Sequence, residues 1–80
     1  MGNWAVYIVK CVDGTLYTGI SNDVPKRIEV HNAGKGAKYT KPRLPVVLVY
    51  CEMAEDRSAA SKREAVLKKL SRLQKLELMK

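Results

Sequence analysis

Phenylalanine is missing from this sequence of 80 residues, histidine occurs once, and cysteine occurs only twice. Both cysteines, Cys11 and Cys51, lie in apolar stretches rather than in loops, so we expect two buried free thiols in a reducing cytosol and no disulfide framework. Two thiols with one imidazole also make a poor ligand set for zinc. No apolar run is long enough to span a membrane, and the first residues lack the pattern of a secretion signal, so we predict a cytoplasmic protein.

Acidic residues are scarce beside basic ones: eight Asp and Glu residues stand against 15 Lys and Arg residues, for a formal net charge of +7. A small basic domain commonly meets a polyanion such as nucleic acid or an anionic membrane, although the charge could also serve only solubility. We expect nucleic acid, DNA before RNA, and no membrane. The length allows one domain, residues 1–80, and the hydrophobic content of 46% is that of a folded protein with a modest core.

Three apolar, β-branched segments predict strands, and three further segments predict helices. Asp13-Gly14 marks a hairpin turn between the first two strands, and the apolar character of the first and third strands predicts that they are largely buried. We expect an α/β protein of the α+β type, in which helices flank a three-stranded, mostly antiparallel sheet in the order β-β-α-β-α-α, with the first strand in the middle. The expected strands are Asn3–Val12, Thr15–Ile20 and Pro45–Glu52, and the expected helices are Asp23–Ala33, Arg57–Leu70 and a third from Ser71 to the chain end.

Capping residues stand where these helices should begin. Asp23 or Asn22 can cap the first helix, Asp56 can cap the second, and Ser71 with Gln74 forms a capping box for the third. In the first helix the core-facing residues should be Val24 and Ile28. In the second helix, the residues that recur at helical spacing are Ala60, Arg63, Val66, Leu67 and Leu70.

The register of the hairpin decides which side chains share a face. A two-residue loop at Asp13-Gly14 would place Tyr7 and Tyr17 on opposite faces of the sheet. A three-residue loop, with a bulge at Gly14, would place both tyrosines on one face and set Tyr7 opposite Gly19. We favour the bulged register because a shared site needs it, and Gly19 would then leave room for something to approach the Tyr7 ring.

The junction between the second strand and the first helix gathers polar groups suited to work on a phosphate. Tyr17 stands just before the junction, and Arg27 and His31 are four residues apart, so they lie on one face of the helix. Each residue also has an ordinary structural interpretation when taken alone. A strand tyrosine usually packs, a histidine near a helix end can favour the helix dipole, and Arg27 could pair with Asp23.

The segment Gly34–Arg43 is expected to be a loop, because glycine and proline interrupt any regular element there. It lacks the spacing of a Walker A phosphate-binding loop. It is either a solvated loop or a surface that contacts nucleic-acid phosphates, with the ring of Tyr39 available for stacking. Its four basic residues are Lys35, Lys38, Lys41 and Arg43.

Taken in order, these groups resemble the signature of the GIY-YIG nuclease domain. The first tripeptide of that signature stands here as Ala5-Val6-Tyr7 and the second as Tyr17-Thr18-Gly19. The following helix carries the expected arginine as Arg27, and the second helix carries the expected acid as Glu64. The resemblance covers essentially the whole chain, and the run from His31 to Thr40 is most similar to small standalone bacterial members. Ala5 and Thr18 depart from the family pattern without removing a reactive group.

The resemblance implies hydrolysis of a phosphodiester with one divalent cation, Mg²⁺ before other ions. Glu64 would hold the metal, and Arg27 would neutralise charge on the phosphate. Tyr17 would take the proton of the attacking water, His31 could accept the phenolic proton, and Tyr7 would position the phosphate or a water. Gly19 and the basic loop would contact nucleic acid. As a structural alternative, Glu64 and Lys68 form an exposed i,i+4 pair.

Two other functional classes fit the same residues. The chain could be a basic nucleic-acid-binding module with little or no catalysis, binding through its loop and its basic second helix. It could also be an interaction subunit of a larger repair or processing complex. The intact set of polar residues favours an endonuclease that acts on DNA.

Overall fold

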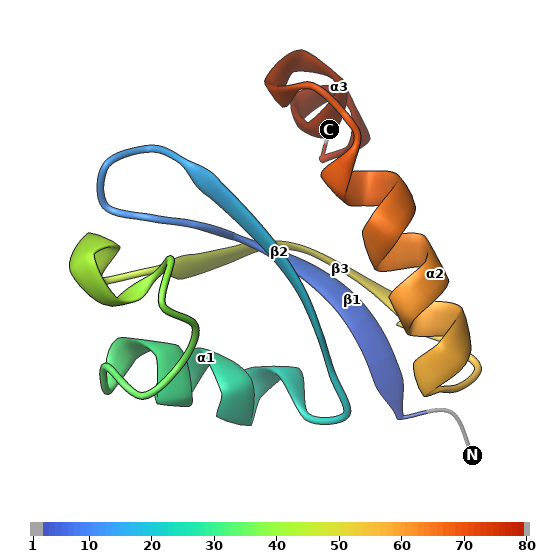
Figure 1. Ribbon diagram of the computed structural model, residues 1–80, viewed down its shortest axis with the longest axis horizontal. Coiled ribbons are helices and arrows are strands. Elements are labelled where there is room, and N and C mark those ends of the chain that lie inside the picture. Colours follow the sequence, from blue (N-terminus) through green and yellow to red (C-terminus); the bar gives the residue numbers. More distant parts are fainter. Residues whose placement is uncertain (1–2, 80) are drawn as a thin grey trace.

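Three strands and three α-helices follow one another in the order β-β-α-β-α-α along residues 3–79, the part of the chain that the computed structural model describes (Figure 1). The predicted fold class and element order are confirmed. The last predicted helix ends at Leu78, and Lys80 lies outside the described residues. The elements are β1 (Trp4–Lys10), β2 (Leu16–Ser21), α1 (Val24–Asn32), a short 3-10 helix η1 (Lys41–Arg43), β3 (Val47–Ala54), α2 (Arg57–Lys68) and α3 (Arg72–Leu78).

The strands form one antiparallel sheet in the order β2-β1-β3, so the first strand is central as predicted. Tyr7 pairs with Gly19, which is the bulged register. Gly14 takes a φ of +85°, a conformation that glycine reaches without the steric cost of a side chain. The backbone N–H of Cys11 donates to the carbonyl of Thr15 at 2.8 Å and closes the three-residue loop. This register sends Tyr7 and Tyr17 to the same side of the sheet.

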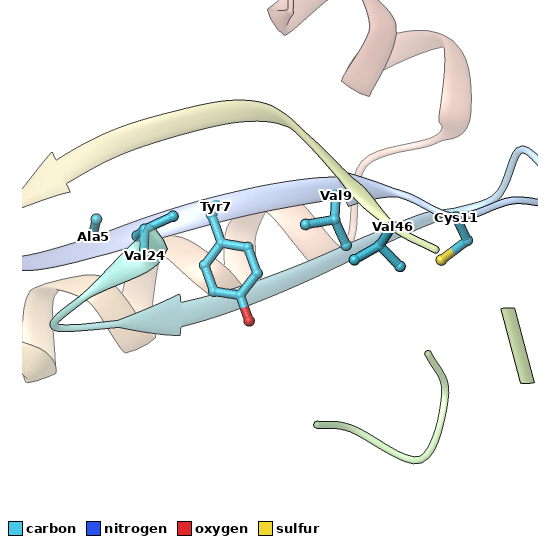
Figure 2. Packing of buried hydrophobic residues seen from close by; sticks show 6 residues of the cluster. All are labelled: Ala5, Tyr7, Val9, Cys11, Val24 and Val46. Carbon is cyan, nitrogen blue, oxygen red and sulfur yellow. The ribbon is translucent and has the colours of Figure 1, made fainter. Parts of the chain in front are cut away.

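Alternate residues of β1 pack on opposite faces of the sheet, as the two-residue period of a strand requires. One face carries Tyr7 and its neighbours against α1, and Figure 2 shows the Tyr7 hydroxyl pointing away from β1. The other face carries Val6 against Ala60 and Leu67 of α2. Figure 1 accordingly shows α1 and α2 on either side of the sheet. The first cluster consists of Ala5, Tyr7, Val9, Cys11, Val24 and Val46, with Tyr17, Ile28 and Leu44 packed against it.

Each helix begins at a predicted cap. The carboxylate of Asp23 accepts from the backbone N–H of Lys26, and that of Asp56 accepts from Ala59 at 2.8 Å. Ser71 and Gln74 form the predicted capping box at the start of α3. The helix starts were therefore readable from local hydrogen-bonding chemistry alone.

The third strand corrects two expectations. It lies at the sheet edge, and Val47, Leu48 and Met53 are exposed, so the prediction of a largely buried strand was wrong. Cys51 on this strand is exposed too, and only Cys11 is a buried free thiol. An apolar run shows that a strand is favoured but not that both of its faces are covered.

Among residues 3–79, no helix is long and apolar enough to cross a membrane.

The basic loop and the second helix differ in smaller ways from expectation. The loop contains the 3-10 turn η1, and α2 ends at Lys68, two residues before the predicted end. Val66 is half exposed, so the face of α2 that packs on the sheet is narrower than its apolar spacing suggested.

Candidate active site

A chain of hydrogen bonds runs inward from the Tyr7 hydroxyl. The hydroxyl lies 2.8 Å from Nε2 of His31, and Nδ1 of His31 lies 3.0 Å from the hydroxyl of Thr40. Thr40 in turn donates its only proton to the carbonyl of Ala37 at 2.9 Å. Because Thr40 can then only accept from His31, Nδ1 carries the imidazole proton and Nε2 accepts the proton of Tyr7. All three side chains are buried.

Burial shifts the acidities of this pair in opposite directions. Burial, with a smaller contribution from Tyr17, raises the pKa of Tyr7 to about 12, and the nearby guanidinium of Arg27 opposes the rise. Burial and the charge of Arg27 lower the pKa of His31. At neutral pH the phenol is therefore protonated and the imidazole is neutral, which is the state that accepts a proton from Tyr7.

Two glycines allow the chain of hydrogen bonds to form. A Cβ at Gly19 would lie 2.6 Å from the Tyr7 hydroxyl, and a Cβ at Gly36 would lie 2.3 Å from Nδ1 of His31. The expectation that Gly19 leaves room for an incoming group was wrong, because the phenol of Tyr7 itself fills that space. Gly19 is buried and supports Tyr7 rather than presenting a surface to nucleic acid.

Tyr17 lies on the same side of the sheet but contacts the histidine differently. Its ring meets the ring of His31 edge-on at 5.6 Å between centroids, and stacks on Tyr39 at 5.9 Å. The hydrogen-bond partner of His31 Nε2 is Tyr7, not Tyr17. The sequence had suggested His31 as the acceptor for Tyr17, and the geometry instead gives this place to Tyr7.

Arg27 and Glu64 bring opposite charges to the same phenol. Arg27 is exposed on α1 and its guanidinium lowers the pKa of Tyr7, while the carboxylate of Glu64 on α2 raises it. Glu64 also pairs with Lys68 at 3.4 Å, as the i,i+4 spacing suggested. The Glu64 side chain is largely covered, with 22% of its surface exposed. Direct contacts thus join Tyr7, Tyr17 and His31, whereas Arg27 and Glu64 are linked to Tyr7 through the effect of their charges on its pKa.

Within residues 3–79, no group of three or more His, Cys, Asp or Glu side chains could hold a metal ion. Glu64 is the carboxylate whose charge acts on the phenol of Tyr7. This set fits Mg²⁺, which binds through one or two carboxylates and substrate phosphates while keeping several waters, and it does not fit zinc.

The basic loop lies against this region through two of its residues. The Tyr39 ring stacks on Tyr17, and the guanidinium of Arg43 lies over it, 4.1 Å from the ring centroid. Arg43 is also paired with Asp13 at 3.1 Å and donates to the Tyr39 carbonyl. A base that stacks on Tyr39 would compete with these two contacts. The loop lysines are all exposed: Lys35, Lys38 and Lys41.

The sequence did not predict the roles of Thr40 and Gly36 beside His31, or the stacking of Tyr39 on Tyr17. Thr40 is fully buried and fixes the tautomer of His31, but nothing in its spacing marks it within a polar loop. Gly36 carried a weaker signal, since a glycine can permit close approach of another group. Such an approach is visible only once the histidine ring is placed above it.

The sequence and the fold of this chain are similar to those of known proteins. The sequence pattern of the GIY-YIG catalytic domain matches residues 3–77. A UPF0213 protein of Staphylococcus haemolyticus is 57% identical over 79 residues, which make up 99% of this chain and 96% of that protein. A UPF0213 protein of Desulfotalea psychrophila is 56% identical over 78 residues, or 96% of this chain and 71% of that protein.

Two solution NMR structures share the fold. A protein from E. faecalis is 39% identical with a TM-score of 0.64, covering 99% of this chain and 88% of the other. A UPF0213 protein from Bacillus halodurans is 44% identical with a TM-score of 0.59, covering 94% of this chain and 80% of the other. None of these relatives' names states an activity.

Proposed function

This chain belongs to the GIY-YIG catalytic domain family, and on that premise we propose that it is an endonuclease that hydrolyses phosphodiester bonds of nucleic acid, DNA before RNA. The observation that carries the proposal is the hydrogen bond of 2.8 Å between the Tyr7 hydroxyl and His31 Nε2, beside the charges of Arg27 and Glu64. Any buried tyrosine hydroxyl needs a hydrogen-bond partner. Here the partner is a neutral imidazole, which can also take up the phenolic proton.

We assign the general base to Tyr7 together with His31. A tyrosinate formed in advance is excluded at neutral pH, because a pKa of about 12 makes ionisation cost about 7 kcal/mol. The Tyr7 side chain is buried in this structure, so the site must open at its hydroxyl before the attacking water can reach it. As the phenolic oxygen then takes a proton from that water, its own proton passes to Nε2 of His31. The water oxygen then forms its bond to phosphorus, and the P–O bond to the leaving oxygen breaks. Thr40 keeps Nε2 in the accepting form until it takes up that proton.

Arg27 and Tyr17 act on the phosphate. The exposed guanidinium of Arg27 can neutralise charge that builds on the non-bridging oxygens. The Tyr17 ring, held between His31 and Tyr39, orients its hydroxyl for a hydrogen bond to the phosphate or to the attacking water. This exchanges the roles that the sequence suggested for the two tyrosines.

Glu64 would hold a divalent cation, Mg²⁺ by the chemistry of its single carboxylate. When bound, that cation supplies positive charge that stabilises the leaving oxygen. In the structure Lys68 balances the Glu64 carboxylate at 3.4 Å. The Lys68 side chain is itself 54% exposed, so it could turn outward and leave the Glu64 carboxylate available to a metal.

The test is nicking of supercoiled plasmid, extended to single-stranded, branched and RNA substrates, over a titration of Mg²⁺. The full chain is compared with Glu64→Gln and with Glu55→Gln, which removes the same charge from an exposed turn. We expect Glu64→Gln to lose about 100-fold or more of the rate and Glu55→Gln to lose little.

Two results would overturn this proposal. A folded Glu64→Gln protein that nicks at the wild-type rate would remove the metal role. Tight binding of every substrate without any cleavage would favour the basic binding module instead.

A further inference from the structure

A pocket of about 150 Å³ lies between the β1–β2 hairpin and α3, apart from the candidate active site. The tyrosines and the histidine of that site are not among its lining residues. Two of its walls are cationic, and the stems of these side chains add apolar surface beside Leu16. The lining residues are Thr15, Leu16, Arg72 and Lys75.

The guanidinium of Arg72 is held in place at this pocket. One of its terminal nitrogens donates to the carbonyl of Gly14 at 2.8 Å, which ties α3 to the turn of the hairpin. A guanidinium carries five N–H donors, so this bond leaves others for a ligand. Arg72 therefore acts as a preorganised donor rather than a freely moving surface side chain.

Lys75 faces the same pocket and is half-buried. Burial and the neighbouring charge of Lys68 lower the pKa of Lys75. Among the residues that the structure describes, neither Arg72 nor Lys75 forms an ion pair with a carboxylate. A half-buried lysine beside an exposed arginine, with the charge of Lys68 nearby, forms an environment that an anion would stabilise.

Acidic groups close to the pocket are already engaged. Asp13 accepts from the backbone and hydroxyl of Thr15 and pairs with Arg43 at 3.1 Å. The charge of Asp13 is thus already balanced by Arg43. The pocket keeps a net positive character, and its volume suits a group the size of phosphate rather than a whole nucleotide.

We propose that this pocket, through Arg72 and Lys75, binds a backbone phosphate of the nucleic acid that flanks the bond to be cut. The assignment rests on the proposed nuclease function for the identity of the ligand. Lys68 connects the two places, since it pairs with Glu64 at 3.4 Å and its charge acts on Lys75. A nucleic-acid strand whose scissile phosphate lies near Glu64 would therefore pass along α2 toward α3. It would place a neighbouring phosphate in the pocket.

The first test is an NMR titration of the ¹⁵N-labelled full chain with inorganic phosphate, and then with a short DNA duplex without divalent cations. We expect the amide signals of Gly14, Leu16 and Lys75 to shift with both probes. Lys75→Gln should weaken the shifts about tenfold, the effect of losing one charge-assisted hydrogen bond. The control, Lys26→Gln, removes the same charge from an exposed position on α1, across the sheet.

A second variant guards against a structural effect. Arg72→Gln removes the bond to Gly14 as well as the charge, whereas Lys75→Gln leaves that bond in place, so loss of binding in both variants supports the pocket. Shifts that are the same in Lys75→Gln and Lys26→Gln would overturn the proposal. So would a response of the pocket to inorganic phosphate but not to DNA, because the ligand would then be a free anion.

Cleavage kinetics separate this proposal from the nuclease function. Lys75→Gln should raise KM about tenfold and leave kcat unchanged, because the contact lies away from the reacting phosphate. If cleavage occurs and Lys75→Gln matches Lys26→Gln in KM, the pocket assignment fails alone. If no substrate is cleaved, the nuclease proposal fails, and the two NMR titrations still decide whether the pocket binds DNA.

Discussion

The phenol of Tyr7 occupies the space in which a side chain at Gly19 would begin: a Cβ on Gly19 would lie 2.6 Å from the Tyr7 hydroxyl oxygen. The two residues are cross-strand partners in the sheet. The ring cannot simply turn aside, because it is buried and its hydroxyl is bonded to His31. The glycine of the second signature tripeptide therefore serves the tyrosine of the first.

Gly19→Ala should displace the Tyr7 hydroxyl from His31. We expect overpacking to lower the free energy of unfolding by about 1–3 kcal/mol. The nicking rate should fall further than the smaller fraction of folded protein can explain. Urea denaturation and nicking rates, measured where both proteins are folded, check this. The control is Gly34→Ala, which strains a φ of +78° by about 1–2 kcal/mol but meets no atom within 4 Å. Equal activities of the two variants would contradict the prediction.

Tyr7→Phe and Tyr17→Phe distinguish the roles of the two phenols. Tyr7→Phe removes the group bonded to His31 and should lower the nicking rate by about 100-fold or more, the usual contribution of a general base. Tyr17→Phe keeps the stacking on Tyr39 and should lower the rate less. Single-turnover rates at saturating enzyme measure both. A larger loss in Tyr17→Phe would return the base role to that residue.

Local chemistry made much of the fold predictable. The Asp-Gly turn, the caps at Asp23, Asp56 and Ser71, and the apolar first strand each encode their own geometry within a few residues. The hairpin register followed from the requirement that Tyr7 and a second tyrosine share a face. Once these elements are fixed, the order of the sheet has few alternatives.

Other features depend on contacts that sequence spacing does not show. The bond between Tyr7 and His31 joins residues 24 apart in sequence, and the choice of Tyr7 over Tyr17 depends on which hydroxyl reaches Nε2. Thr40 became part of the site only because the loop folds back onto α1. The exposure of β3 was likewise hidden, since an apolar run does not report how many layers cover it.

Nicking activity should fall below about pH 6.5 and remain level from there to neutrality. Protonated His31 cannot accept the proton of Tyr7, and burial keeps the pKa of His31 below its ordinary value of 6.5. His31 is the only histidine, so its imidazole resonance can be followed by NMR without assignment of others. A rate that begins to fall well above the measured pKa would show that another group controls the reaction.

Stability should change over the same pH range and with a defined sign. Because His31 binds a proton less readily in the folded than in the unfolded chain, the unfolded state takes up more protons as the pH falls through about 6.5. The free energy of unfolding should therefore decrease below that pH. His31→Gln should remove this slope between pH 5 and 7, since Asp13 and Glu52 have lowered pKa values and act at lower pH. Urea titrations at each pH measure the slope, and an unchanged slope would contradict the assignment.

Two buried threonines should respond in opposite ways to the same substitution. The hydroxyl of Thr18 is buried and has no hydrogen-bond partner among the described residues, whereas the hydroxyl of Thr40 joins His31 to Ala37. Thr18→Val replaces an unsatisfied polar atom by a methyl group of similar shape, so we expect about 1 kcal/mol of added stability and unchanged nicking.

Thr40→Val should cost about 1–3 kcal/mol, because the buried Nδ1–H of His31 loses its partner, while the Ala37 carbonyl loses one donor and keeps its backbone donors. It should also lower the nicking rate, because the tautomer that accepts the Tyr7 proton is no longer fixed. Thermal unfolding measures the difference, and about 1 kcal/mol corresponds to a shift of about 4–8 °C in Tm for a domain of this size. Since both variants remove one hydroxyl from a buried threonine, each serves as the control for the other, and a general intolerance of valine would lower both stabilities.

Loss of stability in Thr18→Val would mean that its hydroxyl has a partner. Full activity in Thr40→Val would show that His31 needs no second contact to accept the proton.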